Sequence, residues 1–214
     1  RVIAPPTVRE NHLFDLIHQT NLVVFEDLIS QRHYLKEIKI PKDQNKPPKE
    51  GLVNEDHISA IFLKVIKNKF ATFGWSVSDQ NKIGVTLSGK GLGEVDGLLR
   101  NRTGQSIAIF EALVLNSLKE DYLNDHLDKV SKYDTAASPL VIFAVYYDGK
   151  TFDDFKKKYY THINNYNTES YKKPLKHSIE HLIENDTFYC FNEKRERGGK
   201  EVHFTHYVMN LLHS

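Results

Sequence analysis

Two acidic residues interrupt short apolar segments near the middle of the chain. Asp96 lies in segment 93–100 and Glu111 lies in segment 107–113. The residues between them include Asn-Arg-Thr-Gly, a sequence typical of turns, so the two segments are expected to form a β-hairpin. Since side chains alternate between the two faces of a strand, a loop with an even number of residues places Asp96 and Glu111 on one face, opposite or diagonal to each other. Glu94 would share that face.

Carboxylates that gather in an apolar setting repel one another unless a cation lies between them or they share a proton. Hard divalent cations such as Mg²⁺ prefer oxygen ligands of this kind. The pair therefore indicates a metal site. The ordinary alternative is a pair of solvated carboxylates at strand ends, neutralised by Arg100 and Arg102.

The elements expected around this hairpin alternate between helix and strand. Apolar residues at helical spacing predict helices over 54–73 and 117–133. Residues 75–78 alternate as a strand does, and 79–82 are expected to turn. The apolar run 139–147 is typical of a strand that is buried on both faces. The expected order is helix, three strands, helix and strand, which predicts an α/β domain with a mixed central sheet.

This order of elements, with the sequences Gly-Glu-Val-Asp and Ile-Phe-Glu-Ala-Leu, resembles the PD-(D/E)XK nuclease superfamily. That family has a restriction-endonuclease-like core of order αβββαβ, and the resemblance covers roughly residues 54–147. It implies metal-dependent hydrolysis of phosphodiester bonds, with Asp96 and Glu111 as catalytic ligands of Mg²⁺ or Mn²⁺. Glu55, near the start of the first core helix, is implied as a further metal ligand.

The sequence departs from this family at Leu113, which stands where the motif Glu-x-Lys has its lysine. Some members carry that lysine on the following helix. At about 100° per residue, Lys129 and Tyr133 lie one turn apart beside the apolar stripe of the expected helix. The resemblance therefore implies Lys129 as the catalytic lysine. Two alternatives stay open: Lys129 is an ordinary surface lysine beside a half-buried tyrosine, or the site has lost its activity.

Nucleic acid, with DNA as the expected substrate, is the partner that the resemblance implies. The residues expected to contact it are Lys90, Arg102, Tyr133 and Lys157. The glycine-rich run 84–93 does not predict a dinucleotide site, because it leads into a strand rather than a helix. Two competing functions remain. One is an inactive module of the same fold that binds nucleic acid or protein, and the other is a scaffold that acts through its N-terminal helical arm.

Flanking segments extend this core on both sides. Residues 8–38 have helical spacing, as one long helix or two shorter ones, and residues 39–51 contain three prolines and four lysines, which predicts a polar linker. We therefore divide the chain into an N-terminal helical arm and linker (1–52), a nuclease-like core (53–150) and a C-terminal helix-plus-hairpin extension packed on the core (151–214).

Two features of the C-terminal extension carry further predictions. Thr151 is expected to cap a helix that ends near residue 163, and Gly198-Gly199 is expected to turn a β-hairpin. His177 and His181 fit the His-x-x-Glu-His pattern of inverted zinc peptidases, which would lie on a helix. Only 33 residues follow His181, and these enzymes need an acidic ligand well downstream. A partly exposed helix face is therefore the preferred interpretation.

The amino-acid composition limits the class of protein and the compartment that can be expected. Hydrophobic residues make up 40% of the chain and charged residues 27%, as in soluble globular proteins. The net charge of +1 neither supports nor excludes a nucleic-acid partner. The single cysteine, Cys190, cannot form an internal disulfide and fits a reducing cytoplasm. No apolar run is long enough for a membrane span, so no membrane contact is expected. A homodimer and a place in a larger multidomain protein both stay open.

Overall fold

A computed structural model of the chain describes residues 12–41, 45, 47–85, 92–134, 138–168, 170–173 and 179–212, with the backbone alone described in 79–85 and 92–94. The helices are α1 (Leu13–Ser30), α2 (Glu55–Ala71), α3 (Glu120–Tyr133) and α4 (Phe152–Asn165). The strands are β1 (Lys36–Lys39), β2 (Lys49–Leu52), β3 (Ser76–Val85), β4 (Leu92–Arg100), β5 (Ser106–Leu115), β6 (Leu140–Tyr147), β7 (Ile179–Glu184), β8 (Phe188–Arg197) and β9 (Lys200–Asn210).

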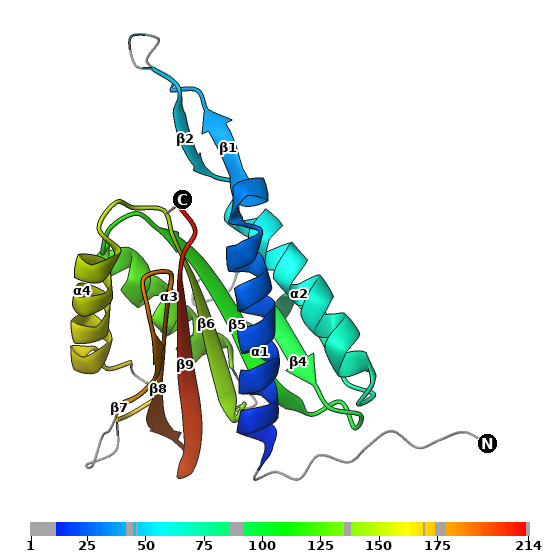
Figure 1. Cartoon of the computed structure of the whole chain (residues 1–214). Coiled ribbons are helices and arrows are strands. Elements are labelled where there is room, and N and C mark those ends of the chain that lie inside the picture. Colours follow the sequence, from blue (N-terminus) through cyan, green and yellow to red (C-terminus); the bar gives the residue numbers. More distant parts are fainter. Residues whose placement is uncertain are drawn as a thin grey trace.

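Seven strands form one mixed sheet in the order β3-β4-β5-β6-β9-β8-β7 (Figure 1). The central strands β5, β6 and β9 are parallel, and the pairs on either side of them are antiparallel. Every residue of β6 is buried, as predicted for a strand that is covered on both faces. The α/β class and the mixed central sheet are therefore confirmed.

Helices cover both faces of this sheet. Figure 1 shows α1 and α2 in front of the sheet and α3 behind it. On the front face, Phe25 of α1 stacks on Phe62 of α2, which stacks on Phe110 of β5, with ring centroids 4.5 and 4.6 Å apart. Leu123 and Leu127 of α3 are fully buried in a second apolar cluster on the other face. α1 thus packs on the sheet beside α2. None of the helices among the described residues is long and apolar enough to cross a membrane.

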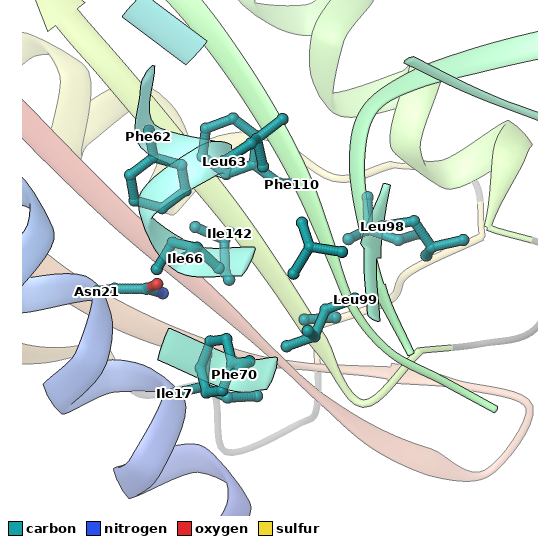
Figure 2. A pocket seen from close by; sticks show the side chains of 13 residues that line it. Ile17, Asn21, Phe62, Leu63, Ile66, Phe70, Leu98, Leu99, Phe110 and Ile142 are labelled. Atoms are coloured by element: carbon teal, nitrogen blue, oxygen red, sulfur yellow. The ribbon is translucent and has the colours of Figure 1, made fainter. Parts of the chain in front are cut away.

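The core between α1, α2 and the sheet is closed. A cavity of about 20 Å³ remains there, lined by apolar side chains and by Asn21 of α1 (Figure 2). This volume has room for a single water molecule at most. The front face therefore offers no room for a larger ligand at this position.

Five local predictions are wrong, three of them before the C-terminal extension. α1 ends at Ser30, and a 3₁₀ turn over Arg32–Leu35 leads into β1 instead of a continued helix. The ends of the predicted linker pair with each other as the β1–β2 hairpin. Residues 79–82 continue β3 instead of turning, because their backbone pairs with β4. β3 is an edge strand, and such a strand tolerates the polar sequence that suggested a turn.

The C-terminal extension contains the other two corrections. His181 lies on strand β7, whose backbone pairs with β8, and its ring contacts the Tyr189 hydroxyl at 3.1 Å. The predicted helix is therefore wrong there, and His177 lies outside the described residues. α4 begins after Thr151 as expected, but the Thr151 side chain makes no capping hydrogen bond. Its backbone N–H instead donates to the Tyr147 hydroxyl at 3.1 Å.

The predicted C-terminal hairpin is confirmed. Gly198 and Gly199 have φ angles of 57° and 78°, which a two-residue turn of the I′ kind requires. The hairpin also continues the central sheet, because β9 pairs with β6 from His203 to Asn210.

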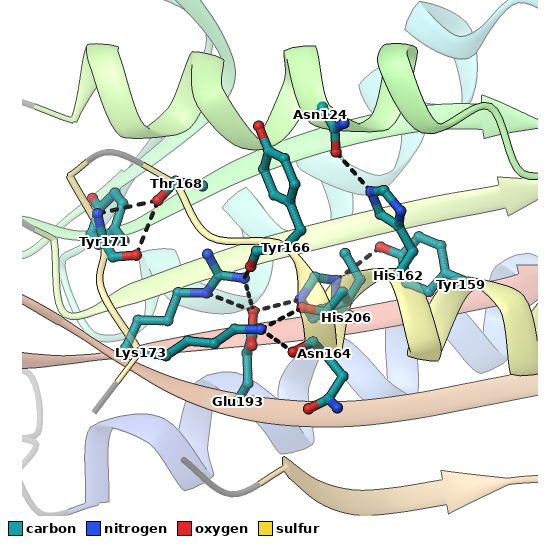
Figure 3. A network of polar contacts seen from close by, with 12 residues as sticks. Asn124, Tyr159, His162, Asn164, Tyr166, Thr168, Tyr171, Lys173, Glu193 and His206 are labelled. Carbon is teal, nitrogen blue, oxygen red and sulfur yellow. Dashed lines mark hydrogen bonds and ion pairs between the residues drawn. The ribbon is translucent and has the colours of Figure 1, made fainter. Parts of the chain in front are cut away.

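A buried polar network lies between α4, β8 and β9 (Figure 3). Arg195 donates from Nε and Nη2 to Glu193 Oε1 at 2.7 and 2.6 Å, and its guanidinium lies over the Phe204 ring. His206 Nδ1 contacts the Tyr159 hydroxyl at 2.8 Å. Burial alone would raise the pKa of Glu193, but the His206 contact and the Arg195 charge outweigh burial and lower this pKa. The network is therefore a neutralised, structural ion pair.

Replacing Arg195 by Met is expected to lower the free energy of unfolding by about 3–5 kcal/mol, because Glu193 would remain as an uncompensated buried charge. The double variant Arg195→Met/Glu193→Leu should lose less, since neither charge is left in the core. Urea unfolding followed by circular dichroism measures both. A double variant less stable than the single one would show that the charge of Glu193 is not the source of the loss.

Candidate metal and catalytic site

The candidate site lies where β4 and β5 separate. Their paired residues end at Gly97 and Phe110, whereas β5 remains paired with β6 as far as Leu115. The same register continued by one residue places Asp96 opposite Glu111. The loop between these strands, 101–105, has an odd number of residues, but a register shift beside Arg100 adds one more residue on β5. The predicted loop with an even number of residues is therefore wrong. The extra residue of β5 nevertheless returns Asp96 and Glu111 to the same face of the sheet.

Beyond this point, two carboxylates replace β4 as the hydrogen-bond acceptors for the backbone of β5. The N–H of Ala112 donates to Asp96 Oδ2 at 2.8 Å, and the N–H of Val114 donates to Glu55 Oε2 at 2.7 Å. Asp96 comes from β4, and Glu55 is the first residue of α2, which the Asn54 side chain caps. Both acids are thus tied to the backbone of β5 just beyond Glu111, at its first and third following residues.

Glu111 is fully buried between these two carboxylates and α3. Its Oε1 accepts from Lys129 Nζ at 2.6 Å and contacts His126 Nδ1 at 2.7 Å. Its Oε2 is buried and has no hydrogen-bond partner among the residues that the structure describes. Burial raises the pKa of Glu111, and the His126 contact and the Lys129 charge only partly oppose this rise. The buried carboxylate is therefore incompletely compensated.

Lys129 is the cation of the site. Its ammonium lies 2.6 Å from Glu111 Oε1 and 3.4 Å from Asp96 Oδ1. Burial alone would lower the pKa of Lys129, but the charges of Glu111 and Asp96 outweigh burial and raise it. The lysine that helical geometry selected from α3 therefore faces both carboxylates.

Sequence reasoning gave no role to two residues that line this site. His126 contacts Glu111, and the Tyr122 ring lies edge-on to the His126 ring with centroids 4.5 Å apart. Burial, and then the charge of Glu55, raises the pKa of Tyr122 to about 12, and its hydroxyl contacts Glu55. Tyr122, His126 and Lys129 stand at positions i, i+4 and i+7 of one helix, so they share a face. This spacing is the signal that could have found them.

The residues predicted to contact nucleic acid are spread over the molecule. Arg102 is exposed in the turn at the closed end of the β4–β5 hairpin, whereas the acids lie at its open end. Lys157 is exposed on α4. Tyr133 is half-buried at the end of α3, one turn beyond Lys129. Lys90 and the Glu94 side chain lie outside the described residues. The roles of these residues stay predictions.

The donor set suits a hard cation, although the side chains are not arranged around one. Asp96, Glu111 and Glu55 supply carboxylate oxygens, which Mg²⁺ and Mn²⁺ prefer, and Glu111 keeps a buried oxygen available. In the described part of the chain, no three His, Cys, Asp or Glu side chains converge closely enough to form a metal site. The Lys129 ammonium instead links two of the acids. A cation would require Lys129 to withdraw from at least one of them.

No protein-family model, curated protein sequence or solved structure matches this chain. The function must therefore be argued from the geometry of the site.

The raised pKa of Glu111 predicts a pH-dependent effect of Glu111→Gln. A carboxyl group whose pKa is higher in the folded state stabilises the fold at low pH, and this contribution is lost as the pH rises above 4.5, the ordinary value for Glu. Gln resembles the protonated acid. The stability of Glu111→Gln relative to the wild type should therefore increase from pH 4.5 towards neutrality.

Urea unfolding at several pH values measures this difference, with Glu26→Gln, an exposed residue of α1, as the matched control. A relative stability of Glu111→Gln that stays constant or falls across this range would contradict the burial of an incompletely compensated carboxylate.

Proposed function

We propose that this chain is a metal-dependent nuclease of the PD-(D/E)XK kind that hydrolyses phosphodiester bonds in DNA. The observation that carries the proposal is the contact of Lys129 with both Asp96 and Glu111. The family motif places its lysine two residues after the glutamate, where this chain has Leu113, and Leu113 is fully buried in the apolar core. Lys129 brings an ammonium group to the same carboxylates from α3.

The order of elements supports the same proposal. Helix α2, strands β3, β4 and β5, helix α3 and strand β6 follow one another as in the αβββαβ core. One acid lies on the second of these strands and the other on the third. We therefore propose that residues 53–150 form a restriction-endonuclease-like core, to which α1 and the strands β7, β8 and β9 are added.

In the proposed reaction, Asp96, Glu111 and Glu55 would hold Mg²⁺ or Mn²⁺. When bound, such an ion would supply a water nucleophile at neutral pH and offset negative charge on the phosphate oxygens. The N–H groups of Ala112 and Val114 hold Asp96 and Glu55 in fixed directions before any substrate arrives. Less reorganisation of these two carboxylates is then needed during the reaction.

Lys129 is expected to act as a charged hydrogen-bond donor rather than as a base. Its raised pKa keeps the amine protonated at neutral pH, so it cannot accept a proton from water. An ammonium group beside the carboxylates can orient the attacking water or stabilise the charge that develops on the phosphate. His126 acts through Glu111, whose Oε1 it contacts, and is a positioning residue.

A second function is favoured by one observation. Lys129 already links Asp96 and Glu111, as an ion pair in a structural role would do. In that case the chain would be an inactive module of the same fold that binds nucleic acid or a protein. Cleavage separates the two functions, because the inactive module would bind without cutting.

The test is cleavage of supercoiled plasmid DNA with Mg²⁺, Mn²⁺ or EDTA. The wild type should cut with either metal and not with EDTA. Asp96→Asn, Glu111→Gln and Lys129→Met should each cut roughly a hundredfold more slowly or worse, since each removes a charge that the reaction uses. Lys132→Met is the matched control, because Lys132 is exposed on the same helix and should be dispensable.

The outcomes distinguish the roles. Loss of cutting in the acidic variants alone would retain the nuclease and remove Lys129 from its mechanism. Asp96→Asn cutting as fast as the wild type would overturn the proposed site. A wild type that binds DNA but does not cut it with either metal would establish the inactive module.

A further inference from the structure

The β1–β2 hairpin projects from the body of the molecule. It forms a two-stranded sheet that is separate from the central one, and Figure 1 shows it extending beyond the end of the molecule at which α2 begins. At its base, Leu35 and Leu52 are buried in the core shared with α1 and α2. Towards its tip, Ile38 and Lys39 are exposed. The hairpin is thus anchored at one end and open to solvent on both faces at the other.

Exposed apolar side chains gather on the hairpin and on the 3₁₀ turn before it. Tyr34, Ile38 and Ile40 have 73%, 67% and 82% of their surface exposed, and they make up three of the five exposed large hydrophobic residues in the described part of the chain. Ile38 and Ile40 are two residues apart, so they point to the same side of the ribbon, which also carries the Lys36–Glu50 ion pair. Grouped apolar side chains that a monomer leaves exposed are typical of a contact surface.

The other face of the hairpin carries two lysines, Lys39 and Lys49, and one acid, Glu37. Lys39 is paired across the ribbon with Lys49, so the two side chains lie side by side. Neither forms an ion pair with a described residue, whereas Lys36 is neutralised by Glu50 at 3.5 Å. Gly51 leaves room for the Lys39 stem, because a Cβ at Gly51 would lie 3.1 Å from Lys39 Cδ. Two neighbouring ammonium groups repel each other unless an anion faces them.

The segment that contains the hairpin also has a positive net charge. The described residues 32–41 and 47–52 contain four Lys or Arg and two Glu, a net charge of +2, whereas the whole chain has +1. Positive charge concentrated on one projecting element is complementary to a polyanion.

The hairpin is joined directly to the candidate site. The N–H of Val53 donates to the Leu35 carbonyl at 2.8 Å and closes the base of the ribbon. Asn54 then caps α2, and Glu55 is the first residue of that helix. Two residues thus separate the end of β2 from a carboxylate of the site. A polyanion bound along the hairpin is held beside the end of the molecule that carries the acids.

We propose that the β1–β2 hairpin is a ribbon that enters a groove of double-stranded DNA and holds the duplex at the acidic site. This proposal rests on the nuclease function proposed above. The major groove of B-DNA admits a two-stranded β-ribbon. Lys39 and Lys49 face the phosphates, and Ile38 and Ile40 make the apolar contact with base edges or sugars. Single strands are usually bound on several stacked aromatic side chains, and strands β1 and β2 contain none.

The test measures binding of the full chain to a short fluorescein-labelled DNA duplex, by anisotropy in EDTA over a series of salt concentrations. Lys39→Gln/Lys49→Gln should weaken binding roughly tenfold near physiological salt and lower the slope of log K against log salt by about two. Ile38→Ser/Ile40→Ser should weaken binding with little change in that slope, because apolar contacts release no counterions. Lys64→Gln/Lys67→Gln, which removes two exposed lysines from α2, is the matched control.

A second readout separates this proposal from the nuclease function. Both hairpin variants should hydrolyse bis(p-nitrophenyl) phosphate, a small phosphodiester, as fast as the wild type with Mn²⁺. Duplex binding that is unchanged in the hairpin variants would overturn the ribbon and leave the nuclease in place. Equal weakening for the matching single strand would overturn the groove contact. Unchanged DNA binding together with an altered oligomeric state in sedimentation would show instead that the hairpin contacts a second copy of the chain.

Discussion

The backbone of β5 beyond Phe110 sets the arrangement of the site. β4 leaves β5 at this point, and the N–H groups of Ala112 and Val114 on the open side need acceptors, because buried unpaired donors are costly. Carboxylates from β4 and from the start of α2 supply these acceptors. Two acids are thereby fixed close to a third, Glu111, which contacts Lys129 and His126 of α3. Their combined charge then requires a cation, and α3 provides Lys129.

The energies involved suggest that this arrangement serves more than stability. Two opposite charges about 4 Å apart attract by roughly 4 kcal/mol at an effective dielectric constant of 20. Removing each ion from water costs several kcal/mol, so the two effects are of similar size. A fully buried Glu111 with one unpartnered oxygen among the described residues is not the most stable choice for this position. Such an under-compensated group in a cluster of like charges is typical of functional sites.

The same sheet contains a second buried glutamate, Glu193, whose environment differs from that of Glu111. Glu193 is as deeply buried as Glu111. The pKa of Glu193 is nevertheless lowered, because contacts with His206 and Arg195 more than offset the effect of burial. The pKa of Glu111 is raised, because burial outweighs His126 and Lys129 while Asp96 adds a like charge. The negative charge of Glu193 is therefore neutralised by its neighbours. The charge of Glu111 is only partly neutralised, and a bound cation could neutralise the rest.

The sequence predicted the elements whose evidence is local. Apolar periodicity found α2, α3 and β6. Strand parity placed Asp96 and Glu111 on one face, although only a bulge that the sequence did not predict makes this so. The resemblance pointed to a lysine on α3, and helical angles selected Lys129. Prediction from the sequence failed where pairing with distant strands decides the structure. The polar residues 79–82 are held in β3 by β4, and His181 is held in β7 by β8. Tyr122 shares a helix face with Lys129, which the sequence does indicate, but its contact with Glu55 depends on how α3 packs beside α2.

The position of β5 within the sheet also explains how the site can be rigid. On one side, β5 stays paired with β6 from Ala108 to Leu115, and β6 is in turn paired with β9 over its whole length. Glu111 therefore projects from a strand that its parallel neighbours hold in place. On the other side, β4 has departed, and side-chain carboxylates occupy the edge. A strand with one edge fixed by its neighbours and the other edge bonded to carboxylates meets one requirement of the hydrolytic site proposed above, which is that its charges are held in place before a substrate binds.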